Sequence, residues 1–281
     1  MKYLSSIFLV LIGFNIFVWY NVFIGEQNNL DIYFLDVGQG DSQLVVLPGG
    51  VKVLIDGGPD KGVLFELSEI LSQTDRYIDL VVMTHPQLDH FGGLLDIVER
   101  YKVGAFISPG RDGDSRAWGD FVDALGKKGT PIVFVGAGDL ISYRDSTLAV
   151  LSPNKEFFSN KEVNESSLVL GLNSEGVRVL FTGDIGFETE NFLVEAYDID
   201  ADILKVAHHG SKFSTGLNFL AETTPRISVI GVGGKNRFGH PTQAALSRLK
   251  SIGSSIYRTD QSGTVHIEAK DGVIGVFAET Q

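Results

Sequence analysis

The stretch THPQLDHFGG, residues 84–93, follows directly on the apolar run IDLVVMT at residues 78–84. This run is continuous and rich in β-branched residues, which predicts a buried strand. A loop that leaves the carboxyl end of such a strand lies at the edge where α/β proteins bind their ligands. His85, Asp89 and His90 are therefore expected at a ligand site, because one tight turn can direct several side chains toward the same point.

Five of the six histidines lie in short loops after predicted strands. Besides the first pair, His208 and His209 follow one strand, His240 follows another, and the acidic residue Asp184 follows a third. Imidazole nitrogens and carboxylate oxygens are good ligands for zinc, manganese or iron. A carboxylate has two oxygens, so Asp184 could bridge two metal ions. The pattern predicts a divalent metal centre where these loops meet.

The chain around these loops reads as short strands and helices in alternation. The predicted strands cover residues 31–37, 43–47, 51–55, 78–84, 105–108, 131–135, 148–151, 167–172, 177–182, 203–207, 227–232 and 264–268. The predicted helices cover residues 63–71, 94–101, 118–127, 188–196, 217–223 and 242–252. Two meanders, each followed by alternating helices and strands, predict an α/β sandwich of two sheets packed face to face with helices outside.

Composition limits the chemistry that this chain can use. Its 281 residues are 43% hydrophobic and 21% charged, which is typical of a globular protein with a sizeable core. The absence of cysteine excludes disulfides, thiolate ligands and a cysteine nucleophile, so any metal must bind imidazole and carboxylate. The net charge of −12 argues against a general nucleic-acid coat protein. It leaves room for an enzyme that holds a phosphate through metal ions.

The N-terminal residues 3–24 are apolar and carry no charge. Roughly 20 apolar residues are enough for a helix to cross a membrane, so we predict an uncleaved anchor, with a cleaved signal peptide as the alternative. Lys2 is the only basic residue before this run and places the N-terminus in the cytoplasm. The expected organisation is a single-pass protein of the cell membrane, with a linker at 25–30 and an extracytoplasmic hydrolase domain at 31–281.

Seven motifs carry a resemblance to a known family. They are FLDVGQGD (34–41), LIDGG (54–58), THPQLDHFGG (84–93), ESSLVL (165–170), LFTGD (180–184), LKVAHHGS (204–211) and NRFGHP (236–241). In this order they resemble the metallo-β-lactamase-like domain at the C-terminus of ComEC-type DNA-uptake (competence) proteins, over nearly the whole chain after residue 30. The resemblance implies an αββα sandwich and a divalent-metal hydrolase, a nuclease that degrades one DNA strand during uptake.

The resemblance also implies roles for individual residues. The implied metal ligands, with Zn²⁺ or Mn²⁺ as the metal, are His85, Gln87, Asp89, His90, Asp184 and His208. The implied catalytic residues are Asp89, His209 and His240, the two histidines acting as a further ligand or as a transition-state donor. The implied substrate contacts are Ser211, Lys212 and Asn236. Which of the paired His208 and His209 holds the metal stays open.

The sequence departs from the family pattern in three ways. Gln87 stands where ComEC-type domains carry Asp and most other members carry His. The extra histidine that many members use for the first metal is also missing, as it generally is in ComEC-type domains. These two departures predict a firm metal position around Asp89, His90 and Asp184, and a weaker one around His85. The polytopic channel segment of those proteins has no counterpart here, so a role in DNA uptake would need a separate channel protein.

Three functions stay open at this point. The first is a phosphodiesterase or nuclease acting on single-stranded DNA, which the cations Lys205, Lys212, Lys235 and Arg237 near the site loops favour. The second is an esterase for envelope phosphodiesters, similar to phosphorylcholine esterases of the same fold. The third is a non-catalytic, metal-stabilised module for DNA binding or assembly.

The remaining candidates are assigned structural roles. Asp36, Asp41 and Asp56 flank glycine-rich turns, where aspartate commonly bonds the backbone, so we expect turn-makers or residues that orient ligands. His266 lies in the alternating strand 264–268 and is expected to face solvent without a function.

Overall fold

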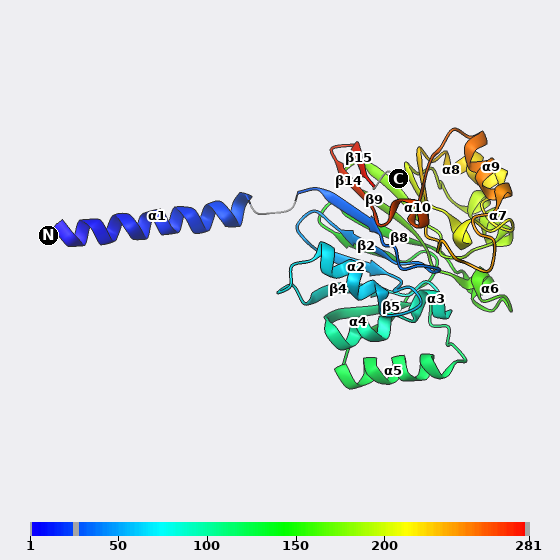
Figure 1. Cartoon of the computed structure of the whole chain (residues 1–281), viewed down its shortest axis with the longest axis horizontal. Coiled ribbons are helices and arrows are strands. Elements are labelled where there is room, and N and C mark those ends of the chain that lie inside the picture. The colour runs from blue at the N-terminus through cyan, green and yellow to red at the C-terminus, as the bar shows by residue number, and fades with distance from the viewer. Residues whose placement is uncertain (1, 25–27, 279–281) are drawn as a thin grey trace.

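The computed structural model describes residues 2–24 and 28–278. The first sheet has eight strands in the order β15-β14-β1-β2-β3-β4-β5-β6, and the second has seven in the order β13-β12-β11-β10-β9-β8-β7. The two sheets lie face to face, with α2, α4 and α5 on one outer side and α7, α8 and α9 on the other (Figure 1). The predicted four-layer α/β sandwich is therefore confirmed.

The bounds of the elements are as follows. The first sheet contains β1 (Leu30–Phe34), β2 (Gln43–Val46), β3 (Lys52–Ile55), β4 (Tyr77–Val82), β5 (Lys102–Ser108), β6 (Ile132–Phe134), β14 (Val265–Lys270) and β15 (Val273–Phe277). The second contains β7 (Leu140–Tyr143), β8 (Ser146–Ser152), β9 (Val169–Ser174), β10 (Val177–Phe181), β11 (Ile203–Lys205), β12 (Ile227–Ile230) and β13 (Ser255–Arg258). The α-helices are α1 (Lys2–Ile24), α2 (Gly62–Ile70), α3 (Leu88–Phe91), α4 (Leu94–Arg100), α5 (Arg116–Lys128), α6 (Lys155–Phe158), α7 (Phe187–Ala196), α8 (Leu217–Thr223), α9 (Gln243–Ser251) and α10 (Thr259–Ser262). Two 3₁₀ turns are η1 (Asn164–Ser166) and η2 (Ala207–Gly210).

Alternation along the strands builds three apolar layers. In β2, Val45 packs into the layer between the sheets, whereas Leu44 and Val46 pack against the helices on the outer side. Successive side chains of a strand point to opposite faces, so a central strand covered on both sides is apolar at every position. Each such side chain contributes about 1.5–3 kcal/mol when fully buried. The three layers fix the relative positions of the sheets.

Parallel pairing brings the functional loops to one end of the sandwich. In the first sheet β3, β4 and β5 run parallel, and in the second β10, β11 and β12 do so. The loops after β4, β10, β11 and β12 carry the motif histidines and Asp184, so the carboxyl ends of strands from both sheets form the site.

The predicted elements are all present, with ends shifted by at most three residues. The prediction missed β7, β13 and β15, which all lie at sheet edges and are partly exposed. The expected closing strand, β14, pairs antiparallel with β1, from Leu30 opposite Ala269 to Phe34 opposite Val265. The C-terminal hairpin therefore completes the first sheet.

Two predictions, one on His266 and one on the N-terminal anchor, need correction. His266 does not face solvent freely: its Nε2 lies 2.6 Å from Asp31 Oδ1, and its ring stacks on Tyr33 at 4.2 Å. The residues of the predicted anchor form the helix α1, which extends away from the sandwich (Figure 1). No helix among residues 2–24 and 28–278 is long and apolar enough to cross a membrane, so a membrane-spanning helix is not supported. Residues 25–27 of the predicted linker lie outside the described residues.

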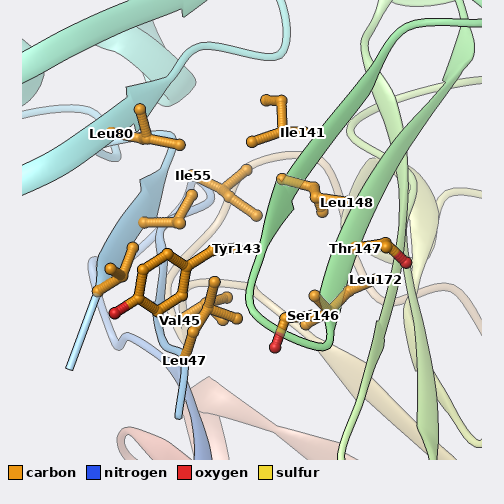
Figure 2. Close-up of a pocket in the computed structure, with 12 residues that line it drawn as sticks. Val45, Leu47, Ile55, Leu80, Ile141, Tyr143, Ser146, Thr147, Leu148 and Leu172 are labelled. Carbon is orange, nitrogen blue, oxygen red and sulfur yellow. The ribbon is translucent and has the colours of Figure 1, made fainter. Parts of the chain in front are cut away.

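An apolar cavity lies between the two sheets. Val45, Ile55 and Leu80 line it from the first sheet, and Ile141 and Leu148 line it from the second (Figure 2). Its lining is mostly aliphatic, with Tyr143, Ser146 and Thr147 at its side, and includes none of the motif histidines. Because it offers no charged group to a phosphate, we treat it as a packing gap in the core.

Candidate metal centre

Four buried side chains meet at the carboxyl ends of the strands. Asp41, His90, Asp184 and His209 each offer one ligand atom, and these four atoms all lie within 4.8 Å of one another. They come from the loops after β1, β4, β10 and β11. Two imidazoles and two carboxylates form a donor set that suits zinc or manganese.

Asp184 occupies the middle of this group. Its Oδ2 atom lies 3.4 Å from His90 Nε2 and 3.5 Å from His209 Nε2. Asp89 Oδ2 lies 3.5 Å from the same His209 nitrogen. Ligand atoms at 2.0–2.2 Å from a tetrahedral metal lie about 3.3–3.6 Å apart, so these separations fit one divalent ion. Within the described part of the chain, the buried Nε2 atoms of His90 and His209 have no hydrogen-bond partner, as expected of metal ligands, and the same holds for His85 Nε2.

Asp56 fixes the orientation of His90. The Nδ1 of His90 donates to Asp56 Oδ2 at 2.7 Å, while the backbone N–H and hydroxyl of Thr84 donate to the two carboxylate oxygens, each at 2.7 Å. This arrangement directs Nε2 into the centre, and a carboxylate behind a histidine is the usual support of a metal ligand. The prediction that Asp56 orients a ligand therefore matches its contacts.

The charges around His90 determine its protonation before a metal binds. Burial alone would lower the pKa of His90, but the carboxylates of Asp184 and Asp56 outweigh it and raise the pKa well above its usual value. Burial would also lower the pKa of His209, and Asp184 and Asp41 raise it. Because a histidine ligand must be neutral, metal binding at this centre releases protons.

A strained backbone positions His209. His208 and His209 have φ values of 50° and 52°, in the left-handed region that costs free energy for any residue with a Cβ. This conformation turns the ring of His209 inward, where Nδ1 donates to Gly231 O at 2.9 Å. His208 stays at the rim with 33% of its side chain exposed, and its Nε2 lies 3.9 Å from Asp184 Oδ2. The metal-binding group thus includes His209, predicted as catalytic, and not His208, predicted as a ligand.

Asp41 belongs to the group although the sequence indicated only a turn-maker. Its backbone N–H donates to Asp89 O at 3.1 Å, which ties the first glycine-rich turn to the histidine loop. A Cβ on Gly40 would lie only 2.3 Å from Asp89 O, and one on Gly231 would lie 2.4 Å from Asp41 Oδ1. Glycine at both positions is therefore what lets Asp41 reach the centre. The pattern G-x-G-D was the signal that could have identified it.

Lys205 is the second residue whose position the sequence did not reveal. We expected a cation near the substrate, yet its side chain is only 1% exposed. Its Nζ forms an ion pair with Asp41, donates to Gly183 O at 2.8 Å and lies 3.7 Å from Asp184 Oδ1. Burial alone would lower the pKa of Lys205, but the charges of Asp41 and Asp184 raise it. The ammonium is thus an internal cation of the centre.

His85 and Gln87, both predicted as ligands, lie outside the group, and so does Asp89, whose Oδ2 lies 3.5 Å from His209 Nε2. His85 is fully buried with its ring centroid 4.1 Å from that of His90, and burial lowers its pKa well below the usual value. Its Nδ1 lies 3.1 Å from the Thr84 hydroxyl. The side-chain amide of Gln87 donates to Asn164 Oδ1 at 2.5 Å, so it is directed at η1.

Asn236 and His240 form one structural unit. Asn236 Nδ2 donates to Gly233 O at 2.8 Å and His240 O at 2.7 Å, and its Oδ1 accepts from His240 N at 3.0 Å. Asn236, predicted to contact substrate, thus shapes the loop that carries His240. The ring of His240 lies 5.7 Å from that of His208 and 6.4 Å from that of His209. Burial and these two histidines lower the pKa of His240 to about 4.

The other two predicted substrate residues differ in accessibility. Ser211 is buried, and its hydroxyl accepts a hydrogen bond from Phe213 N at 3.3 Å. Lys212 is exposed, and its Nζ lies 4.9 Å from the centre of the Phe213 ring. Of these two residues, only Lys212 therefore presents an accessible charge.

Fold and site together are those of the metallo-β-lactamase superfamily. Residues 35–234 match the model of that family, and the chain belongs to it. Among curated relatives, the ComE operon protein 3 of Bacillus subtilis is 32% identical over 88% of this chain and 34% of its own length. The competence protein ComA of Neisseria gonorrhoeae is 27% identical over 92% of this chain and 34% of its own. This chain therefore spans about a third of the length of these relatives.

Solved structures agree on the fold. The metallo-β-lactamase fold protein YhfI from Bacillus subtilis has a TM-score of 0.57 at 12% identity, covering 89% of this chain and 100% of that protein. Zn²⁺-bound PqqB from Methylobacterium extorquens has a TM-score of 0.50 at 12% identity, covering 78% and 85%. The chain is a hydrolase-like protein of this fold, related to competence proteins.

Proposed function

We propose that this protein is a metal-dependent phosphodiesterase that cleaves single-stranded DNA during competence-type DNA uptake. The observation that carries the proposal is the group of Asp41, His90, Asp184 and His209, whose candidate ligand atoms lie within 4.8 Å of one another. The separations of Asp184 Oδ2 from the Nε2 atoms of His90 and His209, 3.4 and 3.5 Å, suit ligands of one divalent ion. A bound divalent metal would supply Lewis-acid stabilisation and a nucleophile derived from water. The kinship with competence proteins supports DNA as the substrate.

The residues at the rim have separate tasks. Burial alone would raise the pKa of Asp89, but its hydrogen bond with His209 and the charge of His90 lower it to about 2. Asp89 is therefore ionised at neutral pH, and it can orient an attacking water by accepting a hydrogen bond. His240, with a pKa of about 4, is neutral at pH 7 and can donate an N–H to a phosphoryl or leaving-group oxygen.

Two exposed aromatic rings favour a nucleic acid over other phosphodiesters. Phe238 is 54% exposed, stacks on His240 with ring centroids 5.8 Å apart, and has the guanidinium of Arg237 5.1 Å from its ring centre. Phe213 is 63% exposed and pairs in the same way with Lys212. Aromatic rings that stack bases, next to cations that attract the backbone, are typical of single-strand binding.

The direct test is a substrate panel with the purified, metal-loaded chain. We expect cleavage of single-stranded DNA and of bis-p-nitrophenyl phosphate with Mn²⁺ or Zn²⁺, and weaker cleavage of duplex DNA. A folded, metal-loaded protein that cuts none of these would contradict the proposal. Cleavage of phosphorylcholine-type envelope polymers with DNA left intact would favour the esterase alternative. Tight DNA binding without turnover would favour the non-catalytic module.

Phe238→Ala tests the stacking role. Loss of one stacked base costs about 1–3 kcal/mol, so KM for a single-stranded oligonucleotide should rise roughly 5- to 150-fold. The same oligonucleotide with abasic sites opposite the ring should show little change, because no base is there to stack. Phe134→Ala removes an exposed phenylalanine of β6 and serves as the matched control. Equal losses on both oligonucleotides would contradict stacking.

The placement of this activity in the cell stays a prediction. An extracytoplasmic position at the cell membrane and cooperation with a separate DNA channel protein rest on the sequence and on the kinship alone. Protease accessibility of the chain in intact cells would test the first, and cross-linking during uptake would test the second.

A further inference from the structure

The buried carboxylates of the centre need a cation of their own. Asp41 and Asp184 are both 1% exposed. A buried carboxylate is costly unless a cation or several hydrogen bonds compensate it. One divalent ion held by His90, His209 and Asp184 leaves Asp41 at its edge, since the closest oxygen of Asp41 to His90 Nε2 is 4.0 Å away.

The two oxygens of Asp184 face different partners. Oδ2 faces the ring nitrogens of His90 and His209 at 3.4 and 3.5 Å. Oδ1 faces Lys205 Nζ at 3.7 Å, and the same ammonium forms the ion pair with Asp41. A carboxylate with two oxygens could bridge two metal ions, but here its second oxygen faces an ammonium.

His85 and Gln87 provide few ligands for a second metal ion. His85 has one buried nitrogen, Nε2, without a hydrogen-bond partner, while the amide of Gln87 is directed at Asn164. Among the described residues, a single group of three or more metal-binding side chains is present, and it does not include His85. A second ion would need the carboxylates of Asp41 and Asp184, and the ammonium of Lys205 already lies beside both.

We propose that Lys205 is a built-in cation that takes the place of a second metal ion, so that the centre binds one divalent ion. Lys205 neutralises Asp41 and lies 3.7 Å from Oδ1 of Asp184, which leaves Oδ2 free for the metal. It is a positioning residue, because its ammonium is buried and bonded to Gly183 O and does not reach substrate. The inference concerns the number of metals and does not depend on the substrate proposed above.

Metal content of the full chain tests this inference without any activity assay. Wild-type protein loaded with Mn²⁺ or Zn²⁺ should retain one ion per chain after desalting, by elemental analysis. Two tightly held ions per wild-type chain would overturn the proposal, and this measurement requires no variant to fold.

Lys205→Met removes the charge while keeping an unbranched side chain. In the folded variant, bound metal should rise toward two ions per chain, or the single ion should bind at least about tenfold more tightly in a chelator competition, because the ammonium no longer opposes it. One ion at unchanged affinity, or loss of all metal from a folded variant, would overturn the proposal. Lys250→Met removes an exposed lysine of α9 and should keep one ion at wild-type affinity.

Discussion

The loop of residues 84–93 in the first sheet and the loop of residues 206–216 in the second each bring two histidines to the centre. One histidine of each pair, His90 and His209, belongs to the metal-binding group. The other one, His85 or His208, lies beside it. The two loops achieve this differently: His90 lies in the short helix α3, whereas His209 has a left-handed backbone.

The difference shows what distinguishes a ligand from its neighbour. His90 and His209 each have Nδ1 bound to a fixed acceptor, Asp56 and Gly231 O, so each directs its free Nε2 at Asp184. His208 lies partly in solvent at the rim. His85 has its Nδ1 on the hydroxyl of Thr84 and its buried Nε2 without a partner, as in the two group members, but it lies outside the group of four. The candidate ligands are the histidines that combine a supported ring with an Nε2 directed at Asp184.

Asp184→Ala should have the largest effect, because both loops direct a histidine at this carboxylate. We expect loss of metal and of activity together, beyond the roughly 100-fold that loss of a supporting residue costs. Elemental analysis and single-turnover assays check it. A variant that keeps its metal would show that the loops do not share Asp184.

A buried carboxylate, that of Glu190, anchors the loop of residues 206–216. This carboxylate accepts from the backbone N–H groups of Thr215 and, at 2.8 Å, Gly216. Burial raises the pKa of Glu190 to about 7, above the ordinary value of 4.5 for a glutamate, although the two N–H groups oppose the shift. Stability from the protonated form is therefore full below pH 4.5 and is lost as the pH rises through 7, by about 3 kcal/mol.

Urea unfolding of the wild type and of Glu190→Gln between pH 4.5 and 8 measures this. The wild type should lose about 3 kcal/mol relative to the variant over that range. Glu222→Gln, an exposed glutamate of α8, should follow the wild type. Parallel curves for wild type and Glu190→Gln would show that Glu190 does not titrate in the folded loop.

Asp56→Asn should weaken metal binding by the loop of residues 84–93 without removing a ligand. The amide can no longer accept from both Thr84 and His90 as an anion, so metal affinity should fall about 10- to 100-fold. Competition with a chelator measures the change, and circular dichroism confirms folding. An unchanged affinity would contradict the importance we assign to ring support.

Gln87→Asp should have the smallest effect. The side chain of Gln87 is directed at Asn164 and lies outside the metal-binding group, so metal affinity should change by less than about threefold. The same chelator competition applies. A strong gain in affinity, or a second bound ion, would show that residue 87 faces the centre.

The sequence alone determined the sandwich and the end of it that carries the site. Alternating apolar runs fix which faces of the strands are buried, so the sandwich follows from a local pattern. The histidines of THPQLDHFGG and KVAHHGS lie at strand ends, so the end of the sandwich that carries the site also follows from a local pattern. The order of the motifs also indicated the family. The residues Asp89, His90 and Asp184 of the predicted firm position are those that surround His209.

Only the tertiary structure decided which side chains meet. Asp41 reaches the centre because Gly40 and Gly231 allow close backbone approach, and Lys205 lies inside because two buried carboxylates compensate its charge. The choice of His209 over His208 follows from a left-handed backbone. The G-x-G-D pattern marks a close backbone approach at Asp41, but which distant segments meet there depends on contacts that no local pattern encodes.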